Sequence, residues 1–184
     1  ESNDSQLYHI PNSRYVKLIA EMLNLPLIEV KSISNDLSEE MNLLTEAIIR
    51  SEAEAIITGG LRSEFQRYNF NRAALKADVR CFNPLWRLAP RILMDELISN
   101  HFHIILVSVA SMGLDKSLLG KKLTTELIKE IQTSDQMSDL VIDGEGGEYE
   151  SFVLDAPFFP SKIRIIESKV YWNEFREVGY FEIV

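Results

Sequence analysis

The sequence predicts an α/β protein in which helices cover both faces of a parallel sheet, followed by a portion that ends in short antiparallel strands. Two observations support this prediction. Up to about residue 142, short apolar runs alternate with amphipathic stretches, as expected of parallel strands joined by helices. Beyond Pro160, apolar runs follow one another without helical segments between them. We therefore expect one α/β domain over residues 1–110 and a second portion over residues 111–184.

The composition limits the class of protein. A chain of 184 residues with 46% hydrophobic content can bury one good core, or one domain with a small appendage. Its formal net charge of -9 disfavours general binding to nucleic acid or to anionic membranes. No apolar run approaches the length of a membrane span, and no signal-peptide pattern opens the chain. A single cysteine, Cys81, excludes a disulfide framework and a cysteine-based zinc site, and it favours a cytoplasmic location.

Helices are predicted where apolar side chains recur every three or four residues. The first has Asn12 as its expected N-cap and ends before Pro26. Pro90 suits the first position of the fourth, because a helix needs no N–H there. The expected helices cover residues 12–24, 37–50, 63–77, 90–99 and 124–133.

Strands are predicted at the short apolar runs between these helices. Residues 104–109 form a continuous apolar run, which we assign to the parallel sheet because such strands are buried on both faces. The other expected strands cover residues 27–30, 55–57, 79–82 and 140–142, with terminal antiparallel strands at 162–166, 169–172 and 180–184.

A glycine turn joins the second expected strand to the helix that follows it. Gly59 and Gly60 lie in this turn, and Ser63 with Gln66 has the spacing of a capping box at the start of the helix. Free N–H groups at a helix N-terminus attract anions, and Arg67 adds positive charge. From the residues alone, an ordinary tight turn with simple capping is the simpler interpretation, and a nucleotide site is the alternative.

Residues 143–151 combine three glycines with four acidic residues, the densest such group in the sequence. The glycines indicate a loop, because glycine costs backbone entropy and packs nothing in a helix or strand interior. Carboxylates crowded this closely usually need a cation, an ammonium group or a wide solvated surface. From composition alone, the simpler interpretation is a solvated acidic turn with Glu148 in the first turn of a following helix. The acids are Asp143, Glu145, Glu148 and Glu150.

The run Gly-Glu-Gly-Gly-Glu-Tyr-Glu-Ser-Phe-Val-Leu-Asp-Ala-Pro at residues 144–157 resembles the signature of the diphthine-ammonia ligase family. These are ATP-using enzymes of the adenine nucleotide α-hydrolase fold, so the resemblance implies a Rossmann-like sheet. The resemblance extends from Tyr8 to Pro157, and Tyr8-His9 matches a pair that the family carries after its second strand. The family's Gly-X-X-X-Ser-X-Phe/Tyr-Gln-Arg pattern is matched by Gly59, Ser63, Phe65, Gln66 and Arg67.

The resemblance implies ATP-dependent amidation of diphthine, a modified histidine of translation elongation factor 2. The reaction proceeds through an acyl-adenylate and releases AMP and pyrophosphate; ammonium supplies the amine, and Mg²⁺ offsets the triphosphate charge. Residues 1–110 would then bind the nucleotide and residues 111–184 would recognise the substrate. The implied nucleotide contacts are Gly59, Gly60, Ser63, Gln66, Arg67 and His9.

Diphthine carries a trimethylammonium group, which carboxylates and a tyrosine ring attract. Through the resemblance, catalytic roles therefore fall to Glu145, Glu148 and Glu150, which could equally position ammonium or a metal; no residue is assigned as a metal ligand. Trp86 serves either packing or binding. The expected substrate contacts are Gly146, Gly147, Tyr149 and Trp86.

One family element does not occur in the sequence: the Ser-Gly-Gly-Lys-Asp-Ser pyrophosphate loop that follows the first strand. Because the sequence begins at Glu1 in a polar stretch, we expect an upstream segment to supply this loop; the alternative is a member that has lost catalysis. Two other functions stay open. One is a different pyrophosphate-loop ATPase, such as a tRNA-modifying enzyme, although the net charge makes nucleic acid an unlikely partner. The other is a non-catalytic nucleotide-binding or protein-interaction module.

Overall fold

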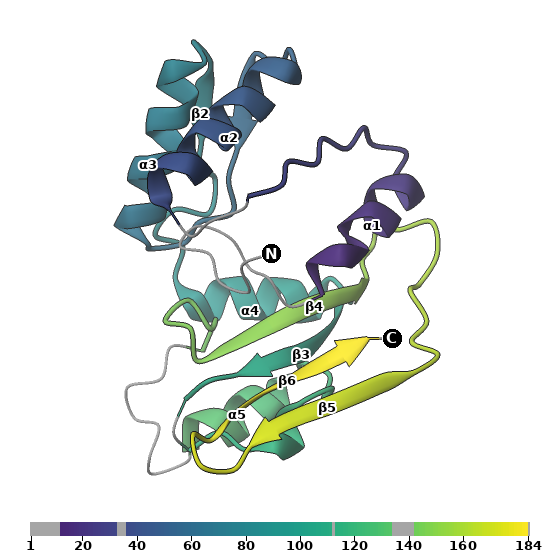
Figure 1. The fold of residues 1–184 in the computed structure, drawn as a ribbon. Coiled ribbons are helices and arrows are strands. Elements are labelled where there is room, and N and C mark those ends of the chain that lie inside the picture. Colours follow the sequence, from purple (N-terminus) through teal and green to yellow (C-terminus); the bar gives the residue numbers. More distant parts are fainter. Residues whose placement is uncertain (1–11, 33–35, 112, 134–141, 184) are drawn as a thin grey trace. The chain divides into compact units, whose positions relative to one another are not determined.

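A computed structural model describes residues 12–32, 36–111, 113–133 and 142–183 (Figure 1). The chain forms two compact units. Unit 1 comprises Glu1–Ile10 and Pro26–Leu88, and unit 2 comprises Pro11–Leu25 and Ala89–Val184. The expected domain boundary at residue 110 falls inside unit 2.

Unit 1 is a small α/β unit with two parallel strands. Both helices begin at side-chain caps: Asp36 accepts a hydrogen bond from the Ser38 amide, and Ser63 accepts one from the Gln66 amide. The helices pack on a core that includes Met41 and Ala73. The elements are α2 (Leu37–Arg50), β1 (Ala55–Ile57), α3 (Glu64–Lys76) and β2 (Arg80–Phe82), and Ile56 of β1 lies opposite Cys81 of β2.

Unit 2 contains a four-stranded antiparallel sheet in the order β4-β3-β6-β5. Its strands are β3 (His103–Val109), β4 (Tyr149–Asp155), β5 (Ser168–Asn173) and β6 (Val178–Ile183). Its helical segments are η1 (Ser13–Tyr15), α1 (Val16–Met22), α4 (Pro90–Ser99), η2 (Lys116–Leu118) and α5 (Thr125–Thr133).

Both faces of this sheet are covered along β3. On one face, Leu106 belongs to a core that Met94 of α4 and several residues of α5 complete. On the other face, Val107 belongs to a core packed against η1 and α1, where the ring of Tyr15 lies edge-on to Phe152 at 6.2 Å between centroids. Leu106 and Val107 are almost completely buried, and burial of each side chain contributes roughly 1.5–3 kcal/mol.

The prediction that residues 104–109 join the parallel sheet is wrong, because β3 pairs antiparallel with both β4 and β6. The physical reason is the cover on both faces of β3: it produces the same continuous apolar run that a parallel strand shows. Among the described residues, parallel pairing occurs only between β1 and β2. The mixed α/β character and the antiparallel C-terminal strands are confirmed.

Several local predictions also change. Residues 27–30 and 162–166 are not strands, and β4 was not expected; residues 140–141 lie outside the described part of the chain and Ile142 is in a turn. The side chain of Asn12 does not cap the first helix. Instead, it pairs with β6, donating to the Phe181 carbonyl at 2.9 Å and accepting from the Ile183 amide at 3.1 Å. No helix within the described ranges is long and apolar enough to cross a membrane.

Candidate functional site

The turn after β1 brings most of the expected nucleotide-binding residues together in unit 1. Thr58 ties the ends of the two strands, because its amide donates to the Phe82 carbonyl at 2.9 Å and its hydroxyl donates to Asn83 Oδ1 at 2.6 Å. Ligands of α/β sheets bind beyond the carboxyl ends of such strands. Residues 59–67 lie at this end.

The two glycines of this turn leave its surface open. A Cβ atom on Gly59 would have no atom within 4 Å, and one on Gly60 would have only Gln66 Oε1, at 3.9 Å. Neither glycine has a left-handed φ. The absence of a side chain therefore leaves the backbone open to approach, and no left-handed turn geometry requires a glycine here. Ser63 Oγ accepts from the Gln66 amide at 3.2 Å, which confirms Ser63 as the N-cap of α3.

Arg67 is held between an acid and an aromatic ring. Its Nε and Nη2 lie 2.8 and 2.7 Å from Glu64 Oε2, and its guanidinium carbon lies 5.0 Å from the ring centroid of Trp86. Trp86 thus lies beside Arg67 within unit 1, and its contact with a substrate stays a prediction. Since exposed ion pairs are worth little, the guanidinium can exchange Glu64 for a phosphate.

Sequence reasoning missed Arg87, which also belongs to this cluster. Its Nη2 lies 3.6 Å from Glu64 Oε1, and its amide donates to the Leu61 carbonyl at 2.8 Å. Arg87 has a left-handed φ of 60°, which no sequence pattern announces for an arginine. Glu64, for which no sequence pattern indicates a role, forms ion pairs with both Arg67 and Arg87.

The acidic loop of unit 2 turns sharply at Gly144 and leads into β4. Gly144 has φ 72°, and a Cβ atom there would lie 2.8 Å from the Tyr149 carbonyl oxygen and 3.0 Å from its ring. The Gly147 amide donates to the Gly144 carbonyl at 2.9 Å, and the Glu145 amide donates to Asp143 Oδ1 at 3.2 Å. The loop is therefore built around its glycines, as the sequence predicts.

Tyr149 supports this loop from within the core. Its side chain is only 5% exposed, and its hydroxyl donates to the Ile142 carbonyl. Burial, together with the charges of Asp143 and Glu148, raises the pKa of the Tyr149 phenol well above its usual value. The phenol stays a hydrogen-bond donor, and its ring packs in the core rather than facing solvent. A direct contact of this ring with a substrate stays a prediction.

Glu148 is held at the end of the acidic loop, next to β3. Its carboxylate lies so close to Gly146 that any Cβ there would collide with it. Its carbonyl accepts from the Ala110 amide at 2.9 Å, which fastens the loop to the end of β3. Within the described part of the chain, the buried Glu148 Oε2 has no hydrogen-bond partner. A buried carboxylate oxygen is costly to leave without a donor, so this atom suits a cation or an N–H group of a ligand.

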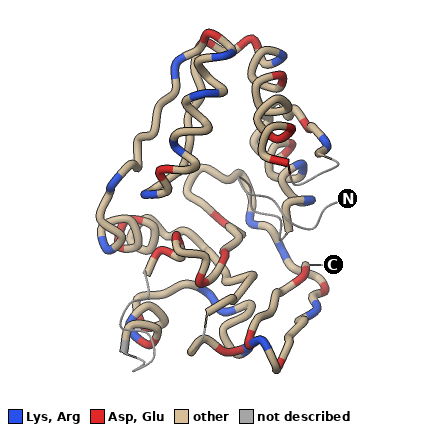
Figure 2. Tube along the Cα trace, turned by 60° about the vertical axis from the view of Figure 1, so that its left-hand side comes forward, with Lys and Arg blue, Asp and Glu red and all other residues tan. Residues whose placement is uncertain are grey.

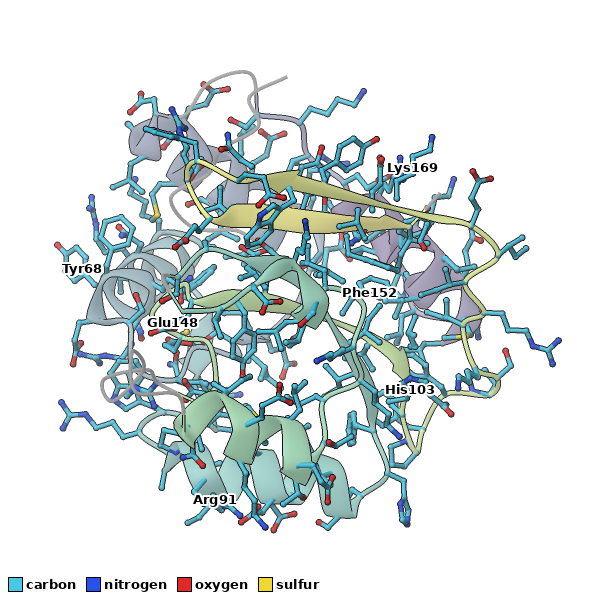
Figure 3. All side chains as sticks on the ribbon, turned by 90° about the horizontal axis from the view of Figure 1, so that it is seen from below. Tyr68, Arg91, His103, Glu148, Phe152 and Lys169 are labelled. Carbon is cyan, nitrogen blue, oxygen red and sulfur yellow. The ribbon has the colours of Figure 1, made fainter. Side chains whose placement is uncertain are left out.

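The remaining expected residues take different positions. Glu148 lies immediately before β4, with Phe152 further along that strand (Figure 3). Gly146 and Gly147 are exposed, and Glu150 lies on β4 opposite Ser108 of β3. His9 lies outside the described residues. The Gly59 turn and the acidic loop belong to different units.

Metal ligands do not cluster in the described ranges, where no group of three His, Cys, Asp or Glu side chains is arranged to hold an ion. This is compatible with Mg²⁺, which usually binds through substrate phosphates and only one or two carboxylates. Acidic and basic positions are interspersed along the described chain (Figure 2).

Comparison with known proteins shows the family. The family model of the diphthamide synthase N-terminal domain matches residues 1–81, and that of the C-terminal domain matches residues 89–184. The chain belongs to the diphthamide synthase family. The two matched regions lie on either side of the unit boundary between Leu88 and Ala89, although Pro11–Leu25, within the N-terminal match, belongs to unit 2.

Curated relatives in this family are named diphthine–ammonia ligases. The protein of Danio rerio is 32% identical over 96% of this chain and 76% of its own length, and that of Homo sapiens is 30% identical over 91% and 68%. The protein of Schizosaccharomyces pombe is 28% identical over 98% of this chain. The chain spans about a third (32%) of that protein's length. The resemblance of residues 8–157 to this family is confirmed.

Proposed function

We propose that this member of the diphthamide synthase family converts diphthine on translation elongation factor 2 to its amide, using ATP and ammonium in the cytoplasm. The observation that carries the proposal is the match of both family domains, which together cover residues 1–81 and 89–184. The relatives' name specifies diphthine and ammonia as the reacting pair.

Unit 1 supplies the nucleotide site in this proposal. Its parallel strand pair and flanking helices form part of an adenine nucleotide α-hydrolase-like sheet, and the open backbone at Gly59 and Gly60 lets phosphates approach the N-terminus of α3. Arg67 exchanges its ion pair with Glu64 for one with a phosphate of ATP, and it neutralises part of the charge of that phosphate. Ser63 and Gln66 hold the helix start in place, and Mg²⁺ enters with the nucleotide.

The substrate carboxylate attacks the α-phosphorus of ATP, and pyrophosphate leaves. Ammonia then adds to the acyl carbon of the adenylate, and AMP leaves with the former carboxylate oxygen. Ammonium must lose a proton before it can attack, and the amine adduct must lose another. Glu148, with its buried Oε2, is placed to hold ammonium and accept a proton from it.

Glu145 and Glu150 extend the negative charge around the proposed ammonium site, and the exposed backbone at Gly146 and Gly147 lets substrate approach. Tyr149 is a positioning residue in this proposal, because its buried hydroxyl donates to the Ile142 carbonyl and so holds the acidic loop in place. Unit 2 is thus the substrate-recognition portion in this proposal.

The proposal is tested with the protein expressed from its full reading frame. The protein is incubated with ATP, Mg²⁺, ammonium and diphthine-bearing elongation factor 2, and AMP release is followed together with the mass of the modified peptide. Stoichiometric AMP with the mass change from carboxyl to amide is the expected result. AMP without that change would refute the substrate, and bound ATP without AMP would favour a non-catalytic module.

A further inference from the structure

Four side chains form a row across the unit 2 sheet, one from each strand. Glu150 of β4 lies opposite Ser108 of β3, Ser108 lies opposite Tyr180 of β6, and Tyr180 lies opposite Tyr171 of β5. Directly opposed residues of antiparallel strands place their side chains on the same face. The row therefore runs from a residue of the acidic segment to a pair of tyrosines.

The neighbouring row lies on the opposite face and shows why these positions are fixed. It consists of Tyr149, Val109, Gly179 and Trp172. A Cβ atom on Gly179 would lie 2.6 Å from the Trp172 ring, so the ring packs directly on the glycine. Tyr149, Val109 and Trp172 all contact the core formed with α4 and α5. This row anchors the β5–β6 hairpin and orients the first row away from that core.

A groove of about 430 Å³ lies along the first row. Its described lining residues include Ser108, Ala110, Asn173 and the two tyrosines; none of the described lining residues is charged, and Glu150 is not among them. On this face, η1 and α1 cover the other end of the sheet, where Tyr15 meets Phe152. Figure 1 shows α1 over one end of β4 and the acidic loop at the other. The amide of Ala110, which lines the groove, donates to the Glu148 carbonyl at 2.9 Å, so the groove adjoins the acidic loop there.

The tyrosines present an aromatic wall. Tyr171 and Tyr180 stack with ring centroids 4.7 Å apart at 19°, and they remain 41% and 45% exposed. Tyr171 covers one face of the Tyr180 ring, and Ser108 is the residue opposite Tyr180 on the other neighbouring strand. Arg14 lies on the same face but is paired with Glu182 at 3.2 Å, which offsets its charge.

The dimensions suit one kind of group. Adjacent strands are about 5 Å apart, so Tyr180 and Glu150 stand about 10 Å apart across Ser108. A quaternary ammonium is attracted to an aromatic face within about 6 Å and to a carboxylate on its other side. The ring of Tyr149 cannot supply this face in the described structure, because it is buried beneath Gly144.

We propose that the groove over Ser108 binds the trimethylammonium group of diphthine against the ring of Tyr180, with the negative charge of Glu150 further along the same row. Tyr171 positions Tyr180 by stacking on its far side. This inference rests on the proposed function, since it names where that substrate's cation lies. The β5–β6 hairpin, which lies outside the signature run at residues 144–157, would then contribute to recognition of the substrate's cation.

A binding titration tests the groove without any catalytic turnover. Tetramethylammonium chloride is the probe, sodium chloride at equal concentration is the control, and tyrosine ring signals are followed by NMR. The variant Tyr180→Leu keeps an apolar side chain but loses the π face, whereas Tyr180→Phe keeps the face. We expect Tyr180→Leu to weaken binding about 5- to 30-fold and Tyr180→Phe to leave it nearly unchanged. Equal affinity in all three proteins, or no binding to the unaltered protein, would overturn the proposal.

Amidation kinetics separate this inference from the proposed function. For Tyr180→Leu, we expect the KM for diphthine-bearing elongation factor 2 to rise by the same factor, with kcat and the KM for ATP unchanged. An unchanged KM for the elongation factor would refute the groove while the ligase activity stands. If the unaltered protein binds tetramethylammonium at Tyr180 but forms no amide, the ligase proposal fails and the cation site is retained. Circular dichroism confirms that each variant is folded.

Discussion

Replacement of Gly144 by alanine tests the architecture of the acidic loop most directly. Gly144 has φ 72°, where an L-residue is strained, and its Cβ would lie 2.8 Å from the Tyr149 carbonyl oxygen. Gly147 provides a matched control in the same loop. Its φ is 84°, but a Cβ there would have no atom within 4 Å. Gly147→Ala therefore introduces the backbone strain alone, and Gly144→Ala adds a collision.

The expected magnitudes follow from these two contributions. A left-handed φ costs an alanine about 1–2 kcal/mol, which is the whole effect expected for Gly147→Ala. At Gly144, relief of the collision must displace Tyr149, which breaks its buried hydrogen bond to the Ile142 carbonyl. Loss of a buried bond of this kind costs about a further 1–3 kcal/mol. We expect Gly144→Ala to lower the free energy of unfolding by about 2–5 kcal/mol in total.

Urea denaturation followed by tyrosine fluorescence and circular dichroism measures both variants against the unaltered protein. Amidation by the two variants is compared under the same conditions, and Gly144→Ala should lose more activity because Glu148 moves with Tyr149. Equal destabilisation by the two substitutions would refute the argument, since it would show that the loop can relax around a side chain at Gly144.

Three further predictions concern the charges of the two candidate sites. Arg67→Ala should weaken ATP binding by about tenfold or more, because a charge-assisted hydrogen bond is lost, whereas Arg72→Ala on the same helix should not; equal effects in calorimetry would contradict a specific role. Glu148→Ala should abolish amide formation and leave ATP binding largely intact, with the exposed Glu167→Ala as control; parallel loss of both activities would exclude this division of labour. Unit 2 should lose stability as pH rises above the ordinary tyrosine pKa of 10.0, because the unfolded chain ionises while folding raises the pKa of Tyr149. Tyr149→Phe should show a smaller loss in thermal denaturation across this range, and an identical pH profile would disprove the assignment.

The candidate site was predictable from sequence where glycines and caps act locally. The turn at Gly59 and Gly60, the cap at Ser63 and the glycine-built acidic loop are all found where the sequence places them. The roles of Glu64 and Arg87 could not be predicted from the sequence. These two residues are 23 positions apart, and their side chains meet only in the folded unit. The position of Tyr171 and Tyr180 in one row with Glu150 could not be predicted either, because it depends on the register of all four strands.

The sequence by itself determined where the helices lie, and for two of them also their ends. Predicted and observed bounds coincide for α2 and α4, because amphipathic period, capping residues and proline act over a few neighbouring residues. The tertiary structure alone decided the partners of β3 and the burial of Tyr149. An apolar run records that a strand is covered, but not whether its neighbours run parallel or antiparallel. Only the nonlocal pairing of β3 with β4 and β6 determines which acids and rings share a face.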